Sequence, residues 1–102
     1  MKTTLSIGLA LVLAHSAAWA GTEESMTKAG CMACHTKDKK LVGPAFKEIA
    51  AKYKGQDVSA KLMEKVRKGG AGTFGPVPMA PNGADKINDA DLKAAVELIL
   101  KS

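Results

Sequence analysis

The sequence is poor in aromatic residues and in residues that bind metals. Its 102 residues include one Trp, one Tyr and two Phe, and only two Cys and two His. No segment alternates apolar and polar residues as a half-buried strand does, so a β-sheet is not expected. A chain of this length holds one domain, and so few large apolar side chains rarely build a stable core alone. We therefore expect a large apolar group to be bound.

The first twenty residues have the features of a secretory signal peptide. Lys2 precedes an apolar run over residues 5–14, and the small residues at both ends of 18–20 are typical of a cleavage site. The pattern predicts that residues 1–20 are removed on export and that 21–102 form a single domain. The alternative is an N-terminal helix of the fold. Because the run is too short for a membrane anchor, we expect a periplasmic protein without stable membrane insertion.

The rest of the chain has helical periodicity in four segments. Apolar residues recur three and four positions apart, which places them on one face of each helix. The four helices are expected to begin near Thr22, at Pro44, after a capping Asp57 or Ser59, and after a capping Asn88. Their inward-facing residues would be Phe46, Ile49, Ala50, Tyr53, Leu62, Met63, Val66, Leu92, Ala95, Val96 and Ile99. The sequence thus predicts an all-α fold whose first helix runs into the cysteines.

Two loops interrupt these helices. Residues 36–43 read as a polar loop. Residues 73–84 contain three Pro and two Gly, so they can be neither helix nor central strand. A loop this long is usually functional in a compact domain. Met79 lies near its centre, and the prolines are expected to hold this residue in a fixed position.

Both cysteines lie in the motif CMACH of residues 31–35, and His35 is the only histidine of the mature chain. Structural zinc needs four ligands, of which this set provides three. A thioredoxin-like exchange site would lie beside a βαβ unit, and a plain disulfide leaves His35 unexplained. C-x-x-C-H is the signal for covalent haem attachment. On one helical turn Cys31, Cys34 and His35 share a face, so both thiols can bond a porphyrin while the imidazole binds its iron.

A second iron ligand must come from a methionine or a lysine, because the mature chain has no other histidine. Its methionines are Met26, Met32, Met63 and Met79. Met32 lies between the thiols, Met26 precedes them on the same helix, and Met63 belongs to an apolar stripe. Met79 is therefore the predicted ligand, the alternative being a loop methionine that only covers the core. Imidazole opposite thioether raises the potential of the iron and suits electron transfer.

The motifs GCMACH (30–35), VGPA (42–45) and GPVPM (75–79) follow one another as in class I cytochromes c. The mature chain most resembles the short bacterial cytochrome c-551 type, periplasmic electron donors in nitrite respiration. This resemblance implies about four helices around one covalent haem c per chain, with a proline-rich methionine loop. It implies His35 and Met79 as the axial ligands.

The resemblance also assigns roles to four further residues. The Pro44 carbonyl would accept a hydrogen bond from the His35 ring, and Gly30 would let the first and last helices cross closely. Phe74 takes the place of a tryptophan that donates to a haem propionate in the family. Leu98 lies near the usual place of another aromatic residue. We therefore include Pro44 and Phe74 among the cofactor-binding residues.

These features predict a one-electron carrier and not an enzyme. The acceptor could be a nitrite reductase, a peroxidase or a terminal oxidase, and the donor a respiratory protein. The alternatives are a haem-based ligand sensor or a peroxidase-like protein with a displaceable Met79, or a thiol or metal-binding module. We expect a monomer. Nucleic acid is not an expected partner of an exported chain without stacking aromatic residues.

The mature chain is basic, with fourteen Lys and Arg against ten Asp and Glu once Lys2 is removed. Most of the basic side chains fall in its first two-thirds: Lys37, Lys39, Lys40, Lys47, Lys52, Lys54, Lys61, Lys65, Arg67 and Lys68. They would form either a solvated helix surface or a patch that steers an acidic redox partner into a transient complex.

Overall fold

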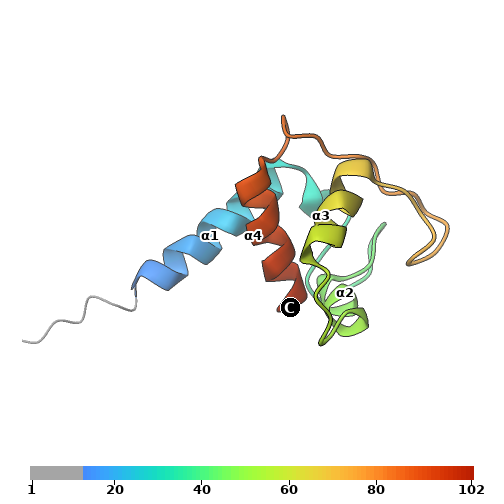
Figure 1. Cartoon of the computed structure of the whole chain (residues 1–102), viewed down its shortest axis with the longest axis horizontal. Helices are drawn as coiled ribbons and strands as arrows, with labels where there is room; N and C mark the ends of the chain where they lie inside the picture. The colour runs from blue at the N-terminus through green and yellow to red at the C-terminus, as the bar shows by residue number, and fades with distance from the viewer. Residues whose placement is uncertain (1–12) are drawn as a thin grey trace, which may run out of the picture.

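The computed structural model describes the backbone of residues 13–102 and the side chains of residues 21–102. This part of the chain is helical (Figure 1): α1 (Leu13–Lys28), a 3-10 turn η1 (Cys31–Ala33), α2 (Phe46–Lys52), α3 (Ser59–Lys68) and α4 (Asp89–Leu100). Its β pairing is limited to two isolated bridges, His35–Lys40 and Gly70–Met79. The prediction of an all-α fold with four helices is confirmed.

Helix α1 begins at Leu13, so the predicted start near Thr22 is wrong. Residues 13–20 contain four alanines, the residue with the highest helix propensity, and they continue the helix backward. The predicted signal peptide lies partly in residues 1–12, outside the described residues, and its removal stays a prediction. In residues 13–102 no helix is both long and apolar enough to cross a membrane.

Helix α1 ends before the cysteines, so the predicted run of one helix into the motif is also wrong. Gly30 has φ 86°, the left-handed conformation in which helices commonly end. The N–H of Ala29 donates to the Ser25 carbonyl, and that of Gly30 donates to Thr27. A Cβ on Gly30 would contact nothing within 4 Å. A glycine is therefore favoured at this position by its positive φ and not by a close neighbour. The implied close crossing of helices at Gly30 is wrong.

Helix α4 is the centre of the packing and contacts α1, α2 and α3. In Figure 1 it crosses α1, and α3 and α2 lie on its other side. The buried core cluster takes residues from α1 and the residue after it, from α2, from α4 and from the segment before α4: Met26, Ala29, Phe46, Ile87, Leu92, Ala95 and Val96. Ile49, Leu62, Met63, Val66 and Ile99 pack against this cluster while partly buried. The predicted inward faces of the helices are thus confirmed, except at Tyr53, which is half-buried and lies outside this cluster.

Of the other three predicted starts, the one at Pro44 is wrong, the one near Ser59 matches α3 without the predicted cap, and the one after Asn88 is confirmed. Helix α2 has Ala45 as its N-cap, and Pro44 precedes it. Helix α3 has Val58 as its N-cap without a side-chain hydrogen bond, so neither Asp57 nor Ser59 caps it. At α4 the prediction holds, because the Asn88 side chain accepts a hydrogen bond of 2.8 Å from the Asp91 N–H.

The start of α2 is set by the preceding loop. The N–H of Phe46 donates to the Thr36 carbonyl at 2.9 Å, and that of Lys47 donates to Lys37 at 3.1 Å. Two of the N–H groups that a helix leaves unpaired at its start are satisfied in this way. The predicted loop of residues 36–43 is therefore held against the beginning of α2.

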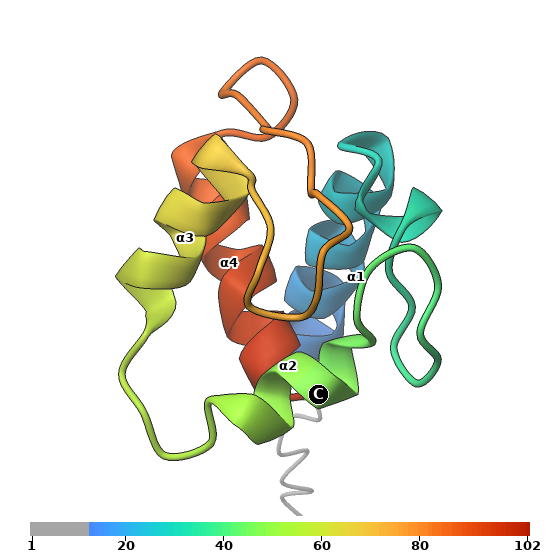
Figure 2. The same cartoon turned by 90° about the vertical axis from the view of Figure 1, so that its right-hand side faces the viewer.

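The loop after α3 folds back on itself. Gly70 and Met79 exchange two backbone hydrogen bonds, of 3.0 and 2.9 Å, and the Gly72 N–H donates to Gly75 at 2.8 Å. Gly69 has φ 68°, and a Cβ there would collide with the carbonyl oxygen of Met79. In Figure 2 the loop hangs in front of α4 and α1, between α3 and the segment that carries the cysteines. Backbone pairing with the end of α3 therefore holds this loop, in addition to its prolines.

Candidate functional site

The two cysteines lie on one helical turn. The N–H groups of Cys34 and His35 both donate to the Cys31 carbonyl, at 3.3 and 3.1 Å. Both thiols are free; Cys34 is exposed, and Cys31 is half-buried against the core. Burial raises the pKa of the Cys31 thiol, because a thiolate is poorly solvated there. The turn therefore presents two thiols and the following imidazole within five residues.

The imidazole of His35 is held by its neighbours. Its Nδ1 lies 2.7 Å from the Pro44 carbonyl oxygen, which can only accept, so Nδ1 carries the hydrogen. The ring stacks on Phe46 with 5.4 Å between centroids and 20° between planes. A Cβ on Gly43 would lie 2.5 Å from its Cε1 atom. This tautomer leaves the lone pair of Nε2 available, as in histidines that bind metals.

The methionines occupy different environments. Met26 is 1% exposed in the core, and Met63 packs against the core. Met32 is exposed between the cysteines. Met79 is half-buried, in the loop whose backbone pairs with Gly70. Two of the four methionines are thus accounted for by core packing, and Met79 is the one on the folded-back loop.

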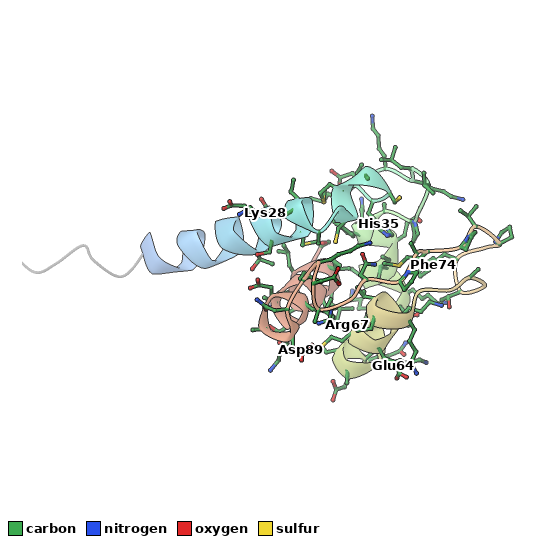
Figure 3. All side chains as sticks on the ribbon, turned by 90° about the horizontal axis from the view of Figure 1, so that it is seen from above. Lys28, His35, Glu64, Arg67, Phe74 and Asp89 are labelled. Atoms are coloured by element: carbon green, nitrogen blue, oxygen red, sulfur yellow. The ribbon has the colours of Figure 1, made fainter. Side chains whose placement is uncertain are left out.

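The predicted site residues fall on two separate segments. Cys31, Cys34, His35 and Pro44 come together on the segment from η1 to α2, whereas Phe74 and Met79 lie on the loop of residues 69–82. Phe74 is 37% exposed, and the Lys52 Nζ lies 5.6 Å from its ring centroid. In Figure 3 His35 and Phe74 both lie away from the N-terminal end of α1.

These two segments also carry the exposed large apolar side chains of residues 21–102: Met32, Leu41, Val42, Phe74 and Val77. Exposed apolar surface that is confined to two neighbouring segments indicates a binding site. Two free thiols, a histidine with a free Nε2, a loop methionine and apolar side chains are the groups that a covalently bound haem requires. The residues present therefore fit a c-type haem.

Comparison with known proteins identifies the family of this chain. The family model described as "Cytochrome c" matches residues 21–102. The chain belongs to the cytochrome c family. It is 51% identical over 80 residues to the cytochrome c2 of Rubrivivax gelatinosus, with 78% of this chain and 94% of that protein covered. It is 40% identical over 85 residues to the cytochrome c-551 of Pseudomonas aeruginosa, with 81% and 79% covered.

A solved structure is similar along most of its length. The crystal structure of Nitrosomonas europaea cytochrome c552 has a TM-score of 0.70 and 41% identity, over 78% of this chain and 96% of that one. The chain is thus a class I cytochrome c of the c-551 type, with the all-α fold of this class. Its relatives are electron-transfer proteins and not enzymes. Haem c is its cofactor, and Cys31 and Cys34 are the only cysteines that could form the thioether bonds.

The sequence analysis missed the inward orientation of one basic residue, Arg67. Arg67 was expected on the outward face of α3, but its guanidinium turns inward and its side chain is 23% exposed. It contacts Asn82, Ile87 and Asp89, which lie between the end of the loop and the start of α4. One signal in the sequence pointed to it, since Arg67 is the single arginine in a chain with fourteen lysines.

Proposed function

We propose that this cytochrome c is a periplasmic one-electron carrier with iron held by His35 and Met79 and haem bonded through Cys31 and Cys34. The observation that supports it most is the hydrogen bond from His35 Nδ1 to the Pro44 carbonyl. It fixes the ring and its tautomer, so Nε2 is the nitrogen left to bind a metal. The two free thiols of Cys31 and Cys34 lie in the four residues just before this histidine, as covalent haem attachment requires.

The protein contributes rigidity on both sides of the iron. The haem, when bound, supplies the one-electron change of its iron. On one side Pro44, Phe46 and Gly43 restrict the His35 ring, so this ligand keeps its orientation whatever the charge on the metal. On the other side the two backbone hydrogen bonds with Gly70 hold Met79. Ligands that do not move favour fast electron transfer, and His35 and Met79 together would leave no free position on the iron for small molecules.

The surface charge supports a transient complex with an acidic redox partner. In residues 21–102 the side chains of Lys28, Arg67 and Lys68 form ion pairs within 4.0 Å. Seven of the other lysines in the first two-thirds of the mature chain are exposed: Lys37, Lys39, Lys40, Lys47, Lys52, Lys54 and Lys61. Steering of this kind raises the association rate more than the affinity. A respiratory donor and an acceptor such as a nitrite reductase, a peroxidase or a terminal oxidase are the proposed partners.

The ligand assignment is tested with two matched variants of the holoprotein, Met79→Leu and Met63→Leu. The oxidised wild type is expected to have the near-infrared sulfur-to-iron charge-transfer band, and its reduced form is expected not to bind carbon monoxide readily. Met79→Leu loses the band and binds carbon monoxide, whereas Met63→Leu keeps the band because Met63 packs against the core. A band that survives in Met79→Leu contradicts the assignment. Ready carbon monoxide binding by the wild type would instead favour a ligand sensor.

A further inference from the structure

Arg67 makes three hydrogen bonds that cross from α3 to the far end of the methionine loop. Its Nη1 donates to the carbonyl of Ile87 at 2.7 Å and to that of Asn82 at 3.2 Å. Its Nη2 donates to the Asp89 Oδ1 at 2.6 Å. Figure 3 shows Arg67 and Asp89 side by side between α3 and α4. One side chain thus holds the carbonyls of a segment that has no regular secondary structure.

The loop is tied to the end of α3 at two places, one at Met79 itself and one three residues later. The first tie is the backbone pair between Gly70 and Met79. The second is at Asn82, whose N–H donates to the Val66 carbonyl at 3.0 Å and whose own carbonyl accepts from Arg67. Only residues 80 and 81 separate Met79 from this second tie. Movement of Met79 away from α3 would therefore strain or break the bonds at Asn82.

The geometry requires an arginine. A guanidinium has five N–H donors in a planar fork and can serve two carbonyls and a carboxylate together, whereas an ammonium is a compact point charge. Asp89 is 88% exposed, so its ion pair contributes little in water. The hydrogen bonds to the Asn82 and Ile87 carbonyls are less exposed, and Ile87 itself belongs to the core. These two bonds are the stronger part of the contact.

We propose that Arg67 is a positioning residue for Met79. It keeps the loop closed against α3 and so keeps the thioether sulfur on the iron. The proposal rests on the assignment of Met79 as an axial ligand. It predicts that loss of the guanidinium speeds the departure of Met79 from ferric iron with little change in the bond itself.

The test measures how fast cyanide replaces Met79 in the ferric holoprotein, followed by loss of the near-infrared band. At saturating cyanide this rate equals the rate at which the methionine leaves. Arg67→Gln is expected to raise the rate by about tenfold, the typical effect of losing hydrogen bonds from a charged group. Arg67→Lys is expected to raise it less. Lys68→Gln removes the same charge from the next residue, which pairs with Glu64, and should stay within about twofold of wild type.

A fourth variant separates positioning from general destabilisation. Val96→Ala leaves a cavity in the core, so it should lower the free energy of unfolding without changing the cyanide rate. The proposal is overturned if the cyanide exchange rate of Arg67→Gln equals that of Lys68→Gln. It is also overturned if Val96→Ala raises this rate as much as Arg67→Gln does when both variants lose the same unfolding free energy. If Arg67→Gln yields no holoprotein, a wild-type rate in Arg67→Lys overturns it. Absence of the band from the wild type itself would overturn the ligand assignment and this proposal together.

Discussion

At the scale of single residues, the site depends on what surrounds His35. The motif of residues 42–45 was interpreted as the start of a helix, with Pro44 at its first position. The resemblance also implied that the Pro44 carbonyl accepts a hydrogen bond from the His35 ring, and the structure confirms this bond. Gly43 in addition makes room for the ring. Local sequence alone identifies Gly43 and Pro44 as a turn. Their contacts with the imidazole depend on His35, which lies nine residues before Pro44.

Gly43→Ala is predicted to damage the histidine side of the site. The added methyl group would lie 2.5 Å from His35 Cε1, so the ring or the Gly43 backbone must shift and weaken the bond to Pro44. We expect a loss of about 1–3 kcal/mol in the free energy of unfolding, measured with guanidinium chloride on the holoprotein. Gly83→Ala is the control, because its nearest neighbour is the exposed and rotatable carboxylate of Asp85. Equal stability of the two variants would contradict this role of Gly43.

At the scale of the elements, helix boundaries followed local chemistry in some places and tertiary contacts in others. Asn88 caps α4 as predicted, since the side chain reaches a backbone N–H three residues away. The start of α2 could not be predicted in this way, because the carbonyls that receive its first N–H groups belong to Thr36 and Lys37. Helix α1 stops at a glycine with positive φ that separates the core helix from the cysteine turn.

Asn88→Ala is predicted to destabilise α4 by removing the acceptor for the Asp91 N–H. The expected cost is about 1 kcal/mol of unfolding free energy. Because α4 packs against the three other helices, the loss should appear as an earlier cooperative transition in thermal and denaturant unfolding. Asn88→Ser restores a side-chain acceptor and should recover most of the stability. A wild-type midpoint for Asn88→Ala would show that the cap contributes nothing.

At the scale of the whole molecule, an excess of positive charge surrounds a small core. The loop of residues 36–43 carries Lys37, Lys39 and Lys40, and a backbone bridge places Lys40 beside His35. All three lysines are exposed, and none forms an ion pair within 4.0 Å in the part of the chain described. Charge close to the redox centre affects small charged oxidants as well as proteins.

Oxidation of the reduced holoprotein by ferricyanide is predicted to slow as the salt concentration rises. Screening weakens the attraction between a basic surface and an anionic oxidant beyond about 10 Å at 0.1 M ionic strength. A triple variant with Gln at positions 37, 39 and 40 should have a shallower salt dependence in stopped-flow measurements. The control carries Gln at Lys86, Lys93 and Lys101, which removes the same charge from α4 and its flanks. Identical salt dependences for the two triple variants would exclude a local role of the loop lysines.

The sequence by itself determined the fold class, the haem-binding motif, the core faces of the helices and the cap of α4, because each depends on residues within a few positions of one another. It also singled out Met79, whose assignment as a ligand stays a prediction. The tertiary structure decided where α1 ends, how His35 is oriented and which way Arg67 points. Each of these depends on atoms that are distant in sequence: a ring against the Pro44 carbonyl, or a guanidinium shared among Asn82, Ile87 and Asp89. Such contacts produce no periodic pattern in the sequence, because their atoms come together only when the chain folds.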